Sequence, residues 1–158
     1  MKFKVSKVER LICLCVRHCD FLEKKTIKDL YNELGDDLVF KSAQLNGVVS
    51  IVAHALSICI EKDKLPDHWS KEYKLIENKI ISYMDELNKA ADILANQNIP
   101  LLALKNSGIT LVMYPYLGSC PMGDFDVLVK KSQFREAHNL LVKNGYKLKF
   151  RYEFEEDN

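Results

Sequence analysis

The stretch that decides the fold runs Gly123-Asp124-Phe125-Asp126-Val127-Leu128-Val129. Its apolar residues are aromatic, β-branched or large, which favours a short β-strand. Side chains alternate between the two faces of a strand, so Asp124 and Asp126 should share one face while Phe125 turns into the core. Two carboxylates on one face can hold a hard divalent cation. On this spacing alone, two solvated acids at the start of a strand are the alternative interpretation.

The residues on either side of this strand predict a small α/β core. Residues 100–104 form an apolar run of strand length, and residues 108–114 are apolar enough to open a helix after a tight turn. Residues 117–123 hold two glycines and a proline, which indicates a loop. A helix is predicted over residues 133–143, and the alternating pattern of residues 146–154 predicts a final strand.

The first part of the chain is predicted to be helical. Apolar residues recur every three or four positions across residues 5–24, 42–61 and 71–97, which predicts three helices. A shorter helix is expected over residues 27–34, with Thr26 as its N-cap. The predicted fold class is therefore α+β.

The change from helical to mixed patterns near residue 97 suggests two regions. A helical region is expected over residues 1–97, and a small α/β core with a mixed sheet over residues 98–158. No internal repeat and no low-complexity segment complicates this division.

Composition limits the classes of protein that need to be considered. The chain has 158 residues with 23 Lys and Arg against 22 Asp and Glu, so bulk charge does not indicate a nucleic-acid coat. There is no apolar stretch near the roughly 20 residues that span a bilayer, and no membrane association is expected. Five cysteines, an odd number without a secretory signal, predict a reduced, cytoplasmic protein.

Some of these cysteines have an alternative interpretation. Cys15, His18 and Cys19 share one face of the first predicted helix, which would allow a zinc site. A structural zinc normally takes four ligands, and several of these positions lie in the apolar stripe, so buried free thiols are the favoured interpretation.

Several further motifs surround the aspartate strand in a fixed order. They are Ile99-Pro100-Leu101-Leu102-Ala103-Leu104-Lys105, Tyr114-Pro115, Gly118-Ser119-Cys120-Pro121-Met122, Ala137, Leu140-Leu141 and Gly145-Tyr146. In order and spacing this series resembles the uncharacterised nucleotidyltransferases of the polymerase-β-like superfamily. The resemblance implies a nucleotidyltransferase core preceded by a helical region.

The resemblance implies roles for five residues. Asp124 and Asp126 correspond to the catalytic pair that binds metal, which would be Mg²⁺ or Mn²⁺. Lys105, Asn106 and Ser107 correspond to the turn that receives a nucleoside triphosphate such as ATP. Backbone N–H groups at a helix start attract anions, and Lys105 would add a positive charge. From the residues alone, a solvated Lys105 and a Ser107 that caps a helix are alternatives.

Three features depart from the family pattern. Asn106 replaces a glycine whose conformational freedom would let the backbone approach phosphate. Cys120 stands where the family has an arginine, which can bind phosphate through two hydrogen bonds. The family's third carboxylate lies on a later strand, where Glu153 is a poor candidate because it alternates opposite the apolar face. The core is thus either truncated or without its third ligand.

The expected function is metal-dependent transfer of a nucleoside monophosphate from an NTP to an unknown acceptor: a protein, an RNA or a small molecule. The alternative is a degenerate, non-catalytic module of the same fold, or a subunit that needs a protein partner, a second copy of itself or a missing C-terminal segment. A third interpretation is an all-helical interaction domain with an accidental Asp-x-Asp, which a structure without a sheet around Phe125 would favour.

Overall fold

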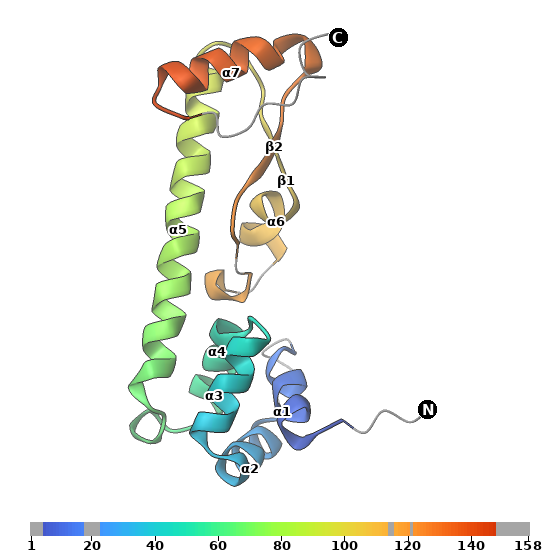
Figure 1. The fold of residues 1–158 in the computed structure, drawn as a ribbon, viewed down its shortest axis with the longest axis vertical. Coiled ribbons are helices and arrows are strands. Elements are labelled where there is room, and N and C mark those ends of the chain that lie inside the picture. The colour runs from blue at the N-terminus through green and yellow to red at the C-terminus, as the bar shows by residue number, and fades with distance from the viewer. Residues whose placement is uncertain (1–4, 18–22, 114–115, 121, 148–158) are drawn as a thin grey trace. The chain divides into compact units, whose positions relative to one another are not determined.

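The structure is a computed structural model (Figure 1), and it describes residues 5–17, 23–113, 116–120 and 122–147. Its contacts divide the chain into two compact units. The first, called the helical unit below, comprises Met1–Ile81 and Leu111–Pro121, and the second, called the sheet unit, comprises Ser82–Thr110 and Met122–Asn158. Each unit takes residues from both sides of the predicted boundary between residues 97 and 98, and that boundary stays a prediction.

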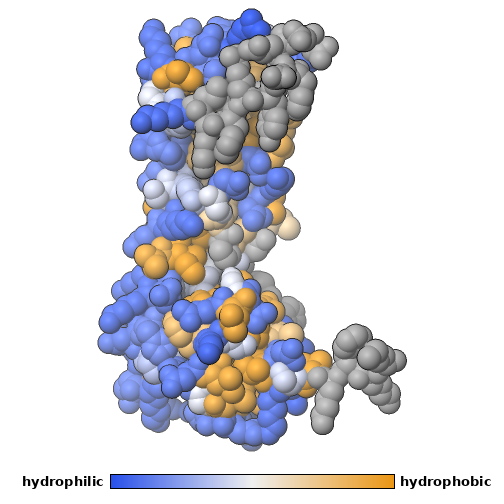
Figure 2. Space-filling model, in the orientation of Figure 1, coloured by the Kyte–Doolittle hydropathy of each residue, from blue (hydrophilic) through white to orange (hydrophobic). Residues whose placement is uncertain are grey.

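The helical unit is built from α1, α2, α3, α4 and the first part of α5. Their bounds are Lys7–Cys15, Lys24–Leu34, Asp36–Leu45, Val49–Cys59 and Asp67–Ala95, and a short 3₁₀ turn at Lys62–Lys64 precedes α5. Figure 2 shows apolar side chains mixed with hydrophilic ones on the surface of this unit. Within the described residues, no helix is both long enough and apolar enough to cross a membrane.

The start of the chain differs from the sequence prediction in its helix bounds. Ser6 caps α1 through a reciprocal pair of contacts with Glu9, whose carboxylate accepts the Ser6 N–H. The helix ends at Cys15 rather than continuing to residue 24. The prediction of Thr26 as an N-cap is also wrong, because α2 already begins at Lys24 and places Thr26 inside the helix.

The single helix predicted over residues 42–61 is also wrong, because two helices occupy this stretch. Gly47 adopts a positive φ of 66° between α3 and α4, a conformation that glycine reaches without a side-chain clash. Val48 donates its N–H to the Ala43 carbonyl at 3.0 Å, which satisfies one of the free carbonyls at the end of α3. The apolar periodicity runs across this break, so periodicity alone does not reveal it.

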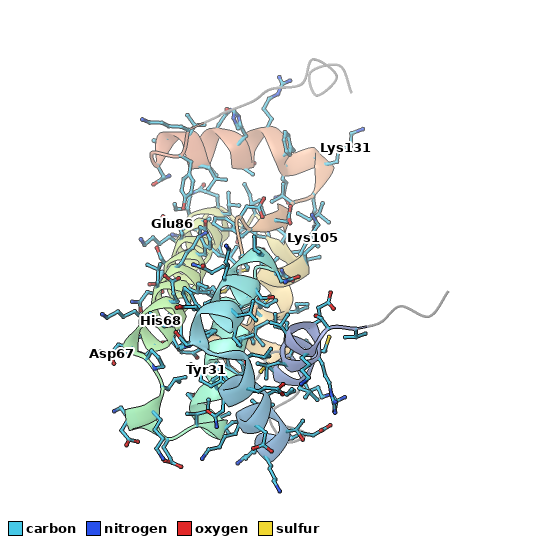
Figure 3. All side chains as sticks on the ribbon, turned by 60° about the horizontal axis from the view of Figure 1, so that its bottom comes forward. Tyr31, Asp67, His68, Glu86, Lys105 and Lys131 are labelled. Atoms are coloured by element: carbon cyan, nitrogen blue, oxygen red, sulfur yellow. The ribbon has the colours of Figure 1, made fainter. Side chains whose placement is uncertain are left out.

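The core of the helical unit is anchored by Trp69, whose side chain is completely buried. Its Nε1 donates to Asp36 Oδ1 at 2.7 Å, and the hydroxyl of Tyr31 donates to the same oxygen. Asp36 thus joins α2, α3 and α5 at one point. Tyr31 is labelled in Figure 3, as is His68, whose Nε2 lies 3.1 Å from Asp36 Oδ2.

The sheet unit contains the last part of α5, the two described strands and α7. The strands are β1 at Leu102–Leu104 and β2 at Asp126–Leu128, and α7 spans Phe134–Lys143 after a 3₁₀ turn at Lys131–Gln133. The strands pair antiparallel, with Leu102 opposite Leu128, Ala103 opposite Val127 and Leu104 opposite Asp126. This sheet excludes the all-helical interpretation and agrees with the predicted α+β class.

A small apolar core holds the sheet unit together. Leu94, Ile99 and Ala137 are its buried members, and residues of the strand flanks and α7 pack against them: Leu101, Val129, Leu140 and Leu141. Tyr146 and Lys147 do not form a strand, and the rest of the strand predicted over residues 146–154 lies outside the described residues. The mixed character of the sheet therefore stays a prediction.

Candidate functional site

The helix α6, at Lys105–Met113, begins directly where β1 ends (Figure 1). Lys105 makes this abrupt turn possible by adopting a positive φ of 50°, which is unfavourable for a residue with a side chain. Gly108 completes the turn, because a Cβ on it would lie 2.6 Å from the carbonyl oxygen of Ala103. Asn106 keeps an ordinary negative φ, so the unusual backbone conformation falls on Lys105 and not on Asn106.

Ser107 connects this turn to the aspartate strand. Its side chain is 8% exposed, and its Oγ accepts the backbone N–H of Asp126 at 3.0 Å. One turn further along α6, Thr110 is also buried, and its hydroxyl contacts the sulfur of Met122 at 3.8 Å. The buried face of α6 therefore fixes the chain leading into β2. The assignment of Ser107 to phosphate binding stays a prediction. Its hydroxyl oxygen already accepts a hydrogen bond from the Asp126 backbone.

Lys105 and Asp126 meet at the end of the sheet. The Lys105 Nζ lies 3.0 Å from Asp126 Oδ2, in an ion pair whose side chains are 75% and 40% exposed. The pairing follows from the register, because Leu104 stands opposite Asp126 and Lys105 comes next along the chain. Figure 3 labels Lys105 at the start of α6. A residue predicted to bind phosphate and a residue predicted to bind metal are thus in direct contact.

Asp124 lies just before β2 and is exposed. The backbone next to it is held by Tyr83, whose hydroxyl donates to the Gly123 carbonyl at 2.8 Å. Among the described residues, the Asp124 carboxylate has no hydrogen-bond or ion-pair partner. The Asp124 carboxylate is therefore open to a ligand, whereas the nearby Asp126 carboxylate is already paired with the Lys105 ammonium group.

The donor chemistry of this pair fits a divalent metal in part. The ammonium group of Lys105 shows that the Asp126 carboxylate accommodates a cation. Mg²⁺ prefers oxygen ligands and often takes only one or two protein carboxylates, with water and substrate phosphates completing its shell. In the part of the chain that the structure describes, no three His, Cys, Asp or Glu side chains form a metal-binding group. Glu153 lies outside the described residues.

The loop that carries Cys120 packs within the helical unit. Ser50 donates its hydroxyl to the Gly118 carbonyl at 2.5 Å, and a Cβ on Gly118 would come 2.7 Å from the ring of Tyr73. Cys120 itself is only 3% exposed. Its thiol therefore has neither the charge of the arginine that the family pattern shows here nor the exposure to contact a phosphate.

His54 lies on α4 and packs against aromatic rings of the helical unit. The structure stacks its ring on Tyr116, with ring centroids 3.6 Å apart and planes at 22°, and on Tyr73 at 6.0 Å. Partial burial lowers the pKa of His54 below its ordinary value, because an imidazole with less contact to water is harder to protonate. Tyr116 is far from His54 in the sequence, so no local signal identifies this contact. The stacking places the His54 ring against the residue that precedes the 3₁₀ turn Leu117–Ser119, which leads to Cys120.

Comparison with known proteins identifies a family. A model of a family described as uncharacterised nucleotidyltransferase matches residues 32–158, which include α3, α4, α5 and the whole of the β1–α6–β2 arrangement. No curated protein and no solved structure matches the chain.

Proposed function

Since the chain belongs to the uncharacterised nucleotidyltransferase family, we propose that it transfers a nucleoside monophosphate from an NTP to an acceptor in a reaction that depends on Mg²⁺ or Mn²⁺. The observation that carries this proposal is the contact between Lys105 Nζ and Asp126 Oδ2 at 3.0 Å. It brings one side chain suited to phosphate and one suited to metal to the same end of the sheet. Polyphosphate bound with its metal needs both kinds of group.

The two aspartates would hold the metal. Asp124 offers an exposed carboxylate. Asp126 offers a second carboxylate, on a residue whose backbone N–H is bound by the Ser107 hydroxyl. The metal would supply positive charge against the phosphate oxygens. A carboxylate on a fixed backbone loses less conformational freedom on binding, which favours a defined site.

The start of α6 would bind the phosphates. The N–H groups of its first turn have no partners within the helix, and the helix dipole makes this end attractive to anions. The Lys105 side chain is 75% exposed, so its ammonium group can turn from Asp126 to a phosphate oxygen. Asn106 follows Lys105 in this turn and would present its backbone N–H together with its side-chain amide.

The reaction that this site would support is a displacement at the α-phosphorus of the NTP. An acceptor hydroxyl oxygen forms a bond to that phosphorus, and the bond from the phosphorus to the oxygen that bridges the α- and β-phosphates breaks. Pyrophosphate leaves, and the proton of the acceptor hydroxyl is released. Catalysis of this kind depends on positioning and on charge stabilisation more than on covalent chemistry by the protein. The acceptor would be a protein, an RNA or a small molecule.

A second candidate is a non-catalytic nucleotide-binding module. The described residues provide two carboxylates and no group of three metal-binding side chains, and the loop residue Cys120 is buried. A site with fewer charges gives less stabilisation to a phosphoryl-type transition state. Such a module would bind a nucleotide and act through a protein partner or a second copy of the chain.

One experiment separates these candidates. The chain is incubated with each NTP carrying a labelled α-phosphate, with Mg²⁺ or Mn²⁺, and with separate pools of RNA, protein and small molecules as acceptors. Transfer of label that is lost in Asp126→Asn and kept in Glu136→Gln would support the enzyme, because Glu136 is an exposed acid on α7 outside the proposed site. Metal-dependent nucleotide binding without transfer to any pool would support the module instead.

A further inference from the structure

The ion pair between Lys105 and Asp126 has an effect on metal binding that the proposed roles do not include. The ammonium group lies 3.0 Å from Asp126 Oδ2, where a divalent cation would have to approach that oxygen. Two cations at neighbouring positions on one carboxylate repel each other, and each reduces the attraction that the carboxylate offers to the other. A metal ion that arrives alone therefore competes with Lys105 for the Asp126 carboxylate.

The backbone around this pair restricts how it can rearrange. Asp126 is held through its N–H by the buried Ser107 hydroxyl. Lys105 adopts a positive φ of 50° in the turn between β1 and α6, and the Gly108 backbone packs so closely on Ala103 that a Cβ there would lie 2.6 Å from the Ala103 carbonyl oxygen. The side chain of Lys105 is the mobile partner, since it is long and 75% exposed.

A polyphosphate gives the Lys105 ammonium a new partner. Phosphate oxygens bound at the start of α6 would attract the ammonium group and free Asp126 Oδ2 for the metal that accompanies the nucleotide. An exposed ion pair is weak enough to be exchanged in this way. The Asp124 carboxylate is exposed and has no partner among the described residues, so it can receive the metal as Lys105 leaves.

We infer that Lys105 is a cation lock: it occupies Asp126 in the free protein and makes metal binding depend on the triphosphate. This inference rests on the proposed function. Its consequence is that Lys105 opposes the binding of free metal but favours the binding of the metal–nucleotide complex. Removing the ammonium group should thus change the two affinities in opposite directions.

The test compares Mn²⁺ alone with the Mn²⁺ complex of a non-hydrolysable ATP analogue. Binding of Mn²⁺ alone is followed by the loss of the electron paramagnetic resonance signal of the free ion. Binding of the Mn²⁺–analogue complex is measured by calorimetry, with the analogue in excess so that all Mn²⁺ is in the complex. Lys105→Met removes the charge, and Lys105→Asn does so with a residue that tolerates the left-handed backbone. Lys131→Met is the matched control, because Lys131 is an exposed lysine past β2, labelled in Figure 3, outside the proposed site.

We expect both Lys105 variants to bind Mn²⁺ alone about 1.5-fold to fivefold more tightly than wild type, the range to which the strength of an exposed ion pair converts. They should bind the Mn²⁺–analogue complex more weakly than wild type, and Lys131→Met should match wild type in both. Unchanged or weaker Mn²⁺ binding in the Lys105 variants, with binding still lost in Asp126→Asn, would overturn the lock and leave the proposed metal site intact. Equal Mn²⁺ binding by wild type and Asp126→Asn would overturn the proposed site itself.

Discussion

The Oγ of Ser107 accepts the backbone N–H of Asp126 at 3.0 Å, and this bond ties the first turn of α6 to the first residue of β2. Both groups come from segments that the sequence separates by a loop, and the bond is partly buried, with Ser107 only 8% exposed. The bond restrains the backbone of Asp126 next to the turn that carries Lys105. The precision of the proposed site depends on this contact.

Replacing Ser107 by alanine should damage both stability and metal binding. The Asp126 N–H would lose its partner in a partly buried position, which costs about 1–3 kcal/mol in the free energy of unfolding. Urea denaturation measures this loss, and Ser132→Ala is the matched control because Ser132 is exposed in the turn before α7. A fall in stability without any fall in Mn²⁺ affinity would contradict the positioning role of Ser107.

Adding a methyl group to Gly108 should disrupt the turn between β1 and α6. The new Cβ would lie 2.6 Å from the Ala103 carbonyl oxygen, which is backbone and cannot rotate away. Overpacking of this kind costs about 1–3 kcal/mol, more than the gain in helix propensity from glycine to alanine. Gly123→Ala is the control, since nothing lies within 4 Å of its Cβ position. Equal unfolding midpoints for the two variants in urea would disprove the close approach.

The two neighbouring acids at the start of α3 should differ in their effect on stability. Asp36 accepts hydrogen bonds from Trp69 Nε1 and from the Tyr31 hydroxyl, whereas Asp37 is exposed. Asp36→Ala leaves the buried indole N–H unpaired and should destabilise the helical unit by about 1–3 kcal/mol. Asp37→Ala loses only a favourable charge at a helix start and should cost less than about 1 kcal/mol. Thermal melting followed by tryptophan fluorescence would compare them, and similar losses would argue against the Asp36 contacts.

Stability should fall in mild acid because of His54. Burial lowers the pKa of His54 in the folded chain below the ordinary 6.5, so the unfolded chain binds the proton more readily. The contribution of His54 is therefore fully present above about pH 6.5 and is lost as the pH falls through the lowered, folded-state value. His54→Phe keeps a ring to stack on Tyr116 but cannot be protonated. The free energy of unfolding of this variant should fall less than that of wild type between pH 7.5 and pH 5, and parallel curves would contradict the assignment.

The parts of the fold that the sequence predicted are those marked by local signals. The apolar runs before Lys105 and after Asp124 predicted both described strands, and the pattern over residues 133–143 predicted α7. The break at Gly47 was missed because apolar periodicity continues through it, and one glycine does not reveal its own φ. Thr26 is a good N-cap by type, but the helix begins before it.

For the candidate site, the sequence predicted the members but not their contacts, and the binding roles of these residues stay a prediction. The spacing of the two aspartates and the motif ending in Lys105 indicated which residues to consider. The ion pair of Lys105 with Asp126 needs the antiparallel register that sets Leu104 opposite Asp126, and register is a tertiary property. The contact of Ser107 with the Asp126 backbone and the stacking of His54 on Tyr116 depend on chain packing for the same reason.

The most direct test of the proposed function is a calorimetric titration of the chain with a non-hydrolysable ATP analogue, with and without Mg²⁺, for wild type, Asp124→Ala, Asp126→Asn and the control Glu136→Gln. If the proposed function is right, wild type and Glu136→Gln bind the analogue in a Mg²⁺-dependent manner, and both aspartate variants lose this dependence. Nucleotide binding that is absent, or that is the same with and without Mg²⁺ in wild type and in the aspartate variants, would contradict it.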